Sequence, residues 1–175
     1  MRAGLSALAL GVCLLPAGCS FGGDEVAQKV QQPALLSAAS IGRLPAGSPE
    51  RTLFEWWRAM QFDDVTAAAP RYARRAGVTA ARLDAQLSTA GRAFDPRPRL
   101  VEVDQRDGRA TVSVLLERRT SNPNGRVDVT RSARAFALVL EGGRWRLADN
   151  RYLEGAVRQQ RELARALRGQ EGSPP

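Results

Sequence analysis

The sequence predicts an α+β domain in which N-terminal helices pack on a four-stranded antiparallel meander, followed by a C-terminal helix. Three observations predict this fold class. Apolar residues recur at helical spacing before DPRPR at 95–99 and alternate with polar residues after it. The turn motifs RDG, NPNG and EGG separate four alternating runs. The segment 151–169 then returns to helical spacing, so two kinds of element are expected in separate parts of the chain.

Helix signals open the domain at Ser48-Pro49, because Ser is a good N-cap and Pro a good first helical residue. The residues of this helix that share one face are Leu53, Phe54, Trp57 and Met60. Asp63-Asp64 is expected to cap a second short helix that is broken near Pro70. Thr79 caps a third helix, which ends at Gly91.

The strand runs are RLVEVDQ at 99–105, RATVSVLLERRTS at 109–121, RVDVTRSARAFALVLE at 126–141, and a final strand that begins at Arg144. Short turns between consecutive runs predict antiparallel neighbours. The alternation places these apolar side chains on the inner face: Val101, Val103, Val112, Val114, Leu116, Phe136, Leu138, Leu140, Trp145 and Leu147.

The first twenty residues are typical of a secretory signal. They begin with one positive charge, continue with an apolar run, and reach the small residues before Cys19. The apolar run is shorter than the roughly 20 residues that a spanning helix needs. LLPAGC at 14–19 resembles the bacterial lipobox, although Pro16 stands where that pattern usually has Leu. An ordinary signal peptide with an unrelated cysteine is the alternative.

The lipobox resemblance implies cleavage between Gly18 and Cys19, diacylation of Cys19 and a palmitate-type lipid anchor. Two acyl chains give lasting membrane attachment. The expected organisation is a signal peptide at 1–18, a lipidated cysteine and flexible tether at 19–48, one domain with its C-terminal helix at 49–168, and a disordered tail at 169–175. As an alternative, ALLSAASI at 34–41 packs against the domain. The expected location is the cell membrane or outer membrane, on the extracytoplasmic side.

The amino-acid composition excludes several classes of catalytic and binding site. The chain has no histidine, and both cysteines, Cys13 and Cys19, are used up by the expected processing, so histidine-based and thiol-based nucleophile pairs are excluded. No phosphate-binding or nucleophile-elbow motif is present, and we expect no metal and no cofactor. The formal net charge is +8 at pH 7. Nucleic acid is not expected as a partner, because the chain is predicted to be exported and has no DNA-binding motif.

Two segments, SPERTLFEWWRAMQFDDVTAAAP at 48–70 and EGGRWRLADNRYL at 141–153, resemble the nuclear transport factor two-like fold of ketosteroid isomerases and polyketide cyclases. The resemblance implies a curved, cone-like sheet whose interior can bind an apolar ligand. It also implies that an enzyme of this family would place an acid, Tyr or His inside the cone. The residues that could occupy such positions are Asp63, Asp64, Tyr72 and Asp149.

Each of these residues also has a structural interpretation. Asp63 and Asp64 lie where a helix cap belongs, and Asp149 could pair with a neighbouring arginine. Tyr72 is expected as a half-buried wall residue with a solvated hydroxyl. Trp56 and Trp57 point about 100° apart on a helix. One of them could lie at the rim and contact a ligand or partner, but core or half-exposed packing of both is the simpler expectation. The residues proposed for the pocket or its rim are Phe54, Trp57, Tyr72 and Trp145.

The leading functional prediction is a non-catalytic, lipid-anchored envelope module that binds a small apolar molecule or an envelope protein. A pocket enzyme of the isomerase or cyclase type that uses a carboxylate is one alternative. Another is a basic scaffold that contacts anionic envelope polymers through Arg118, Arg119, Arg126 and Arg131, although these arginines could equally form a solvated hairpin end. The helix at 151–169 is expected to dock its apolar stripe on the domain; the alternative is contact with lipid headgroups.

Overall fold

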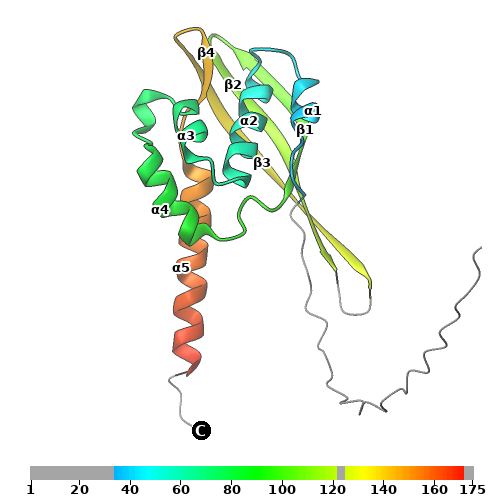
Figure 1. The fold of residues 1–175 in the computed structure, drawn as a ribbon, viewed down its shortest axis with the longest axis vertical. Helices are drawn as coiled ribbons and strands as arrows, with labels where there is room; N and C mark the ends of the chain where they lie inside the picture. The colour runs from blue at the N-terminus through cyan, green and yellow to red at the C-terminus, as the bar shows by residue number, and fades with distance from the viewer. Residues whose placement is uncertain (1–33, 122–124, 172–175) are drawn as a thin grey trace, which may run out of the picture.

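The computed structural model describes residues 34–121 and 125–171, and it confirms the α+β fold class. Four antiparallel strands form one sheet in the order β1-β2-β3-β4. Helices precede the sheet in the sequence, and a long helix follows it (Figure 1). The elements are α1 Ala38–Gly42, α2 Pro49–Gln61, α3 Val65–Ala68, η1 Ala69–Arg71, η2 Arg74–Ala76, α4 Ala80–Ala90, β1 Arg97–Arg106, β2 Arg109–Ser121, β3 Val127–Glu141, β4 Arg144–Leu147 and α5 Arg151–Glu171.

The predicted helix starts are confirmed. The Ser48 side chain accepts a hydrogen bond from Arg51 N at the start of α2, with Pro49 in the first helical position. Thr79 caps α4 in the same way by accepting from Arg82 N. Serine and threonine at these positions satisfy backbone donors that have no partner within the helix.

The hairpin turns are also confirmed where the structure describes them. Asp107 and Gly108 join β1 to β2 with φ of 48° and 71°, and Gly142 and Gly143 join β3 to β4 with φ of 59° and 74°. Positive φ at both central positions matches the twist of the flanking strands. NPNG has only Gly125 within the described residues, because 122–124 lie outside them.

Two residues predicted to face inward are exposed. The register shifts between Leu100 and Glu102, so Val101 is an extra residue in β1 and its side chain is 64% exposed. A β-bulge of this kind breaks the alternation on which the prediction depends. Leu140 keeps the alternation but lies next to the β3–β4 turn, and it is also exposed.

Residues 34–48 pack on the domain, as in the alternative for ALLSAASI, so the domain begins before residue 49. Leu36 and Ile41 are buried. Gln61 at the end of α2 fixes this segment, because its Oε1 accepts from Leu36 N at 2.9 Å and its Nε2 donates to Ala34 O at 3.3 Å. The predicted signal peptide, the Cys19 anchor and the first part of the tether lie outside the described residues.

Helix α5 docks over only its first half. Leu153 and Val157 are buried, whereas the described side chains from Arg158 to Arg168 are exposed, including Leu163 and Leu167. The distal half projects beyond the body of the domain (Figure 1). The expectation that the whole stripe docks is therefore wrong, since α5 continues past the elements on which its first turns pack. No helix among the described residues is long and apolar enough to cross a membrane.

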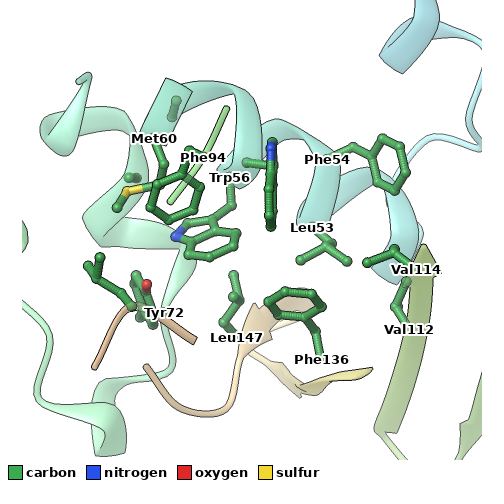
Figure 2. Packing of buried hydrophobic residues seen from close by; sticks show 14 of the residues in the cluster. Leu53, Phe54, Trp56, Met60, Tyr72, Phe94, Val112, Val114, Phe136 and Leu147 are labelled. Atoms are coloured by element: carbon green, nitrogen blue, oxygen red, sulfur yellow. The ribbon is translucent and has the colours of Figure 1, made fainter. Parts of the chain in front are cut away.

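The core between α2 and the sheet is dominated by aromatic rings (Figure 2). Trp56 and Trp57 are 1% and 0% exposed, which confirms the expected core or half-exposed packing of both. The ring of Trp56 lies 5.5 Å from that of Phe94 and 5.9 Å from those of Tyr72 and Phe136, measured between centroids. Edge-to-face contacts of this kind add to the stabilisation from burial.

Candidate functional site

A pocket of about 700 Å³ lies between the helix-covered face of the sheet and the first turns of α5. Its aromatic lining comes from four elements or their ends: Trp56 on α2, Tyr72 after η1, Phe136 on β3 and Tyr152 on α5. One side of the mouth is formed by the β2–β3 hairpin and the opposite side by α5. Both elements extend from the same end of the domain (Figure 1).

Strand alternation explains which side chains reach the pocket from the sheet. Leu116 and Ser132 are directly opposite each other on β2 and β3, and Arg118 is opposite Thr130. Even-numbered residues of β2 and β3 face the helices, which also brings Arg134 to the lining beside Phe136. The sheet therefore lines the pocket with apolar residues such as Leu116 and Phe136 and with the arginines Arg118 and Arg134.

A hydrogen-bond chain fixes one wall of the pocket. The Tyr72 hydroxyl donates to Asn150 Oδ1 at 2.7 Å, and Asn150 Nδ2 donates to Gln86 Oε1 at 2.7 Å. Tyr72 is 3% exposed, so the predicted solvated hydroxyl is wrong: the hydroxyl is satisfied by Asn150 within the protein. Burial raises the pKa of Tyr72 well above its ordinary range. The Trp56 indole N–H opposes this rise but lies outside hydrogen-bond geometry.

Tyr152 forms the opposite side of the aromatic lining. Its hydroxyl donates to Ala93 O at 2.6 Å, and its ring lies 5.5 Å from that of Phe136. Burial raises the pKa of Tyr152 to about 12, and the positive charges of Arg134 and Arg118 oppose this rise. Both tyrosines are therefore neutral hydrogen-bond donors near neutral pH.

The four residues that the sequence predicted for the pocket or its rim do not lie together in the structure. Of the four, only Tyr72 lines this pocket. Phe54 lines a different hollow, beside α1 and β1. Trp57 and Trp145 are buried and line neither. Trp57 does not line the pocket because its position on α2 directs it into the core, whereas its neighbour Trp56 lies at the pocket.

Of the candidate carboxylates, Asp64 is a helix cap and Asp149 is a partner of arginine, whereas Asp63 is not the residue that caps α3. Asp64 caps α3, where its Oδ1 accepts from Ala67 N at 3.0 Å, and this hydrogen bond lowers its pKa. Asp63 lies in the preceding turn with φ of 54°. Asp149 does line the pocket, but its Oδ2 is 3.4 Å from Arg151 Nε. The pairing expected for Asp149 is confirmed.

The hairpin arginines do not form one cluster. Arg119 and Arg131 pair with Glu117 on the outer face of the sheet at 3.1 and 3.5 Å, although Arg131 also borders the pocket. Hydrogen bonding from Arg119 lowers the pKa of Glu117. Arg118, one residue from Arg119, faces the pocket instead. Neighbouring strand residues point to opposite faces, so this separation was predictable.

Sequence reasoning missed several residues that line the pocket or hold its wall in place. Arg134 precedes Phe136 by two residues, and the same alternation would have placed it on the inner face. The sequence has no local signal for Asn150 and Gln86. Asn150 is hydrogen-bonded to Gln86, 64 positions away in the chain, and to Tyr72, 78 positions away. Among the described residues, no group of three or more acidic, His or Cys side chains could hold a metal ion.

The comparisons with known proteins find similar solved structures. Neither a family model nor a curated protein matches the chain. A protein of unknown function from Mycobacterium tuberculosis is 12% identical with a TM-score of 0.45, covering 67% of this chain and 87% of its own.

Two further similar structures are a SEC-C motif containing protein from Rhodopseudomonas palustris and an NTF-2 like protein of unknown function from Shewanella oneidensis. The first is 15% identical with a TM-score of 0.43, covering 60% of this chain and 78% of its own. The second is 11% identical with a TM-score of 0.41, covering 57% of this chain and 91% of its own.

Proposed function

We propose that this chain is a lipid-anchored module of the cell envelope that binds a small, largely apolar molecule without transforming it. The observation that carries the proposal is the pocket of about 700 Å³ with its lining of four aromatic side chains. A volume of this size is within the range of small-molecule sites, which are mostly apolar with a few polar groups that orient the ligand.

The polar groups of the pocket favour binding over catalysis. The Tyr72 hydroxyl is engaged by Asn150, and the Tyr152 hydroxyl by Ala93 O. Asp149 is 40% exposed and paired with Arg151. A carboxylate that serves as general base must be free to take a proton from the ligand, whereas the Asp149 carboxylate is engaged by Arg151.

Binding can be tested by filling the pocket from α5. Gly155 lines the pocket, and a Cβ added there meets only the end of the Arg158 side chain, at 3.9 Å. Gly155→Leu should therefore fold normally and block the pocket, while Ala164→Leu adds a comparable group to the exposed half of the same helix. We expect native mass spectrometry of the chain from its own membrane to show a co-purifying small molecule that Gly155→Leu loses and Ala164→Leu keeps.

The opposite result would reject the binding proposal: a chain that purifies without any bound molecule and binds neither charged nor neutral hydrophobic probes. The membrane anchor is tested separately. Intact mass should show a diacylated chain that begins at Cys19, and Cys19→Ser should release the domain from the membrane fraction. A mature chain that retains residues 1–18 would contradict the anchor.

A basic scaffold remains the second candidate, and the outer face of the sheet is the observation that favours it. Glu117 is 9% exposed and pairs with Arg99, Arg119 and Arg131, so this cluster has a surplus of positive charge. If this face holds anionic polymers, Arg99→Gln with Arg131→Gln should lower the salt concentration that elutes the protein from a heparin column. Unchanged elution would reject this role.

A further inference from the structure

The pocket has a positive wall beside its aromatic lining. Arg118 and Arg134 reach it from neighbouring strands, β2 and β3. Both guanidinium groups act on the same phenol, since each opposes the rise in the pKa of Tyr152. Both arginines therefore border the same pocket as the rings of Tyr152 and Phe136.

Neither arginine forms an ion pair with a carboxylate in the described part of the chain. Arg118 Nη2 donates to Arg92 O at 3.2 Å, and Arg134 Nη1 donates to Ala133 O at 2.8 Å. Each guanidinium has five N–H donors, so these single backbone contacts leave further donors available.

The nearby acids are engaged elsewhere. Asp149 at the pocket pairs with Arg151, and Glu154 pairs with Arg82 at 2.9 Å. Glu117 belongs to the outer face of the sheet. The lining contains one carboxylate, that of Asp149, and four arginines: Arg118, Arg131, Arg134 and Arg151. With Arg131 and Arg151 paired, Arg118 and Arg134 provide a net positive potential at the mouth.

We propose that the pocket takes an anionic amphiphile, whose apolar body lies against Phe136, Tyr152 and Trp56 and whose carboxylate, sulfonate or phosphate group is held by Arg118 and Arg134. This inference rests on the proposed function and specifies its ligand class. Arginine suits the role because its planar donors match the oxygens of such groups, and a hydrogen bond between charged partners is stronger than a neutral one.

The test compares two fluorescent probes with the same aromatic body, one anionic and one neutral. The anionic probe is 1-anilinonaphthalene-8-sulfonate and the neutral one is N-phenyl-1-naphthylamine. Every protein is the full chain with Cys19→Ser, so that no attached acyl group competes. The variants are Arg118→Gln, Arg134→Gln and the double variant. Arg106→Gln is the matched control, since Arg106 is 82% exposed at the β1–β2 turn and lines none of the described pockets.

We expect the anionic probe to bind about tenfold more tightly than the neutral one. Each single variant should weaken the anionic probe about threefold to fivefold, and the double variant about tenfold or more. Binding of the neutral probe should change less than about twofold in every variant, and Arg106→Gln should behave as the parent does. Higher salt should weaken only the anionic probe, as expected for partly exposed charges.

The outcomes separate the two proposals. If neither probe binds, the pocket does not take small molecules and the proposed function fails. If both bind equally and the arginine variants change neither, the binding function stands and the anionic ligand class is rejected. Sodium sulfate at constant ionic strength tests the charge alone. If it displaces the probe at low millimolar concentration from the parent protein, the site recognises a free anion, and the requirement for an apolar body is rejected.

Discussion

The ionisation of Tyr152 gives a quantitative test of the pocket structure. In the folded protein, burial raises its pKa from the ordinary 10.0 to about 12. The unfolded chain therefore loses this proton at lower pH than the folded chain. The resulting stabilisation is fully present below about pH 10 and is lost as the pH rises through about 12. Two pH units correspond to about 3 kcal/mol of unfolding free energy, since each unit is worth about 1.4 kcal/mol.

Tyr152→Phe isolates this contribution. Near pH 9 the variant should be about 1 kcal/mol less stable than the parent, because it lacks the hydrogen bond to Ala93 O. The order should reverse near pH 11, and above pH 12 the variant should approach about 2 kcal/mol greater stability, since it has no phenol to ionise at this position. Urea unfolding followed by circular dichroism at several pH values between about 9 and 13 measures both free energies.

Absorbance at 295 nm supplies a direct reading of tyrosine ionisation. The chain has two tyrosines, Tyr72 and Tyr152, and burial raises the pKa of both. The native protein should therefore show little tyrosinate at pH 10.5, while the protein in 8 M urea should be largely ionised. If half of the absorbance change of the native protein occurred near pH 10, one of the two rings would not be buried as described. If Tyr152→Phe kept this change near pH 10, the ring in question would be that of Tyr72.

Three further comparisons test the packing and turns of the domain by urea denaturation. Leu53→Ala removes a side chain that is 0% exposed and should cost about 3–4 kcal/mol, whereas Leu163→Ala on the exposed half of α5 should change stability by under about 0.5 kcal/mol; similar costs would contradict the assignment of core and surface. Asn150→Ala should cost about 2–3 kcal/mol by leaving the Tyr72 hydroxyl buried without a partner, and adding Tyr72→Phe should recover part of this loss rather than add to it. Gly77→Ala should cost about 1 kcal/mol through backbone strain alone, since φ is +60° and no atom lies within 4 Å of the added Cβ; an unchanged midpoint would argue against the left-handed turn.

The sequence predicted the elements well because their signals are local. Ser48 and Thr79 act within three residues of themselves, and the Asp107-Gly108 turn fixes the pairing of its own strands. Alternation then determines the face of each strand residue as long as no residue is inserted. Val101 shows the limit of this rule. The bulge inserts one residue into the strand, so the side chain of Val101 is exposed although the valine spacing in the sequence predicts that it faces inward.

The pocket was harder to predict because it depends on contacts between distant segments. Two adjacent tryptophans on α2 gave no indication of which one would face the pocket, and that choice depends on how the helix is rotated against the sheet. The contact between Tyr72 and Asn150 spans 78 residues. The positions of Arg118 and Arg134 could have been predicted, since alternation places them on the same face as Leu116 and Phe136. Treating the hairpin arginines as one cluster ignored the two faces of the strand.

The point where the chain enters the domain connects the two proposals. Ala34 N donates to Asp95 O at 3.3 Å, and the pocket lining includes Ala93 and Pro96 on either side of that contact. An acylated Cys19 would be joined to Ala34 by fifteen peptide units, which span at most about 50 Å. The pocket would then stay within that distance of the bilayer, a source of amphiphiles. Anchor and pocket remain separable, because Cys19→Ser should remove this proximity to the bilayer while leaving the affinity of the pocket for a dissolved probe unchanged.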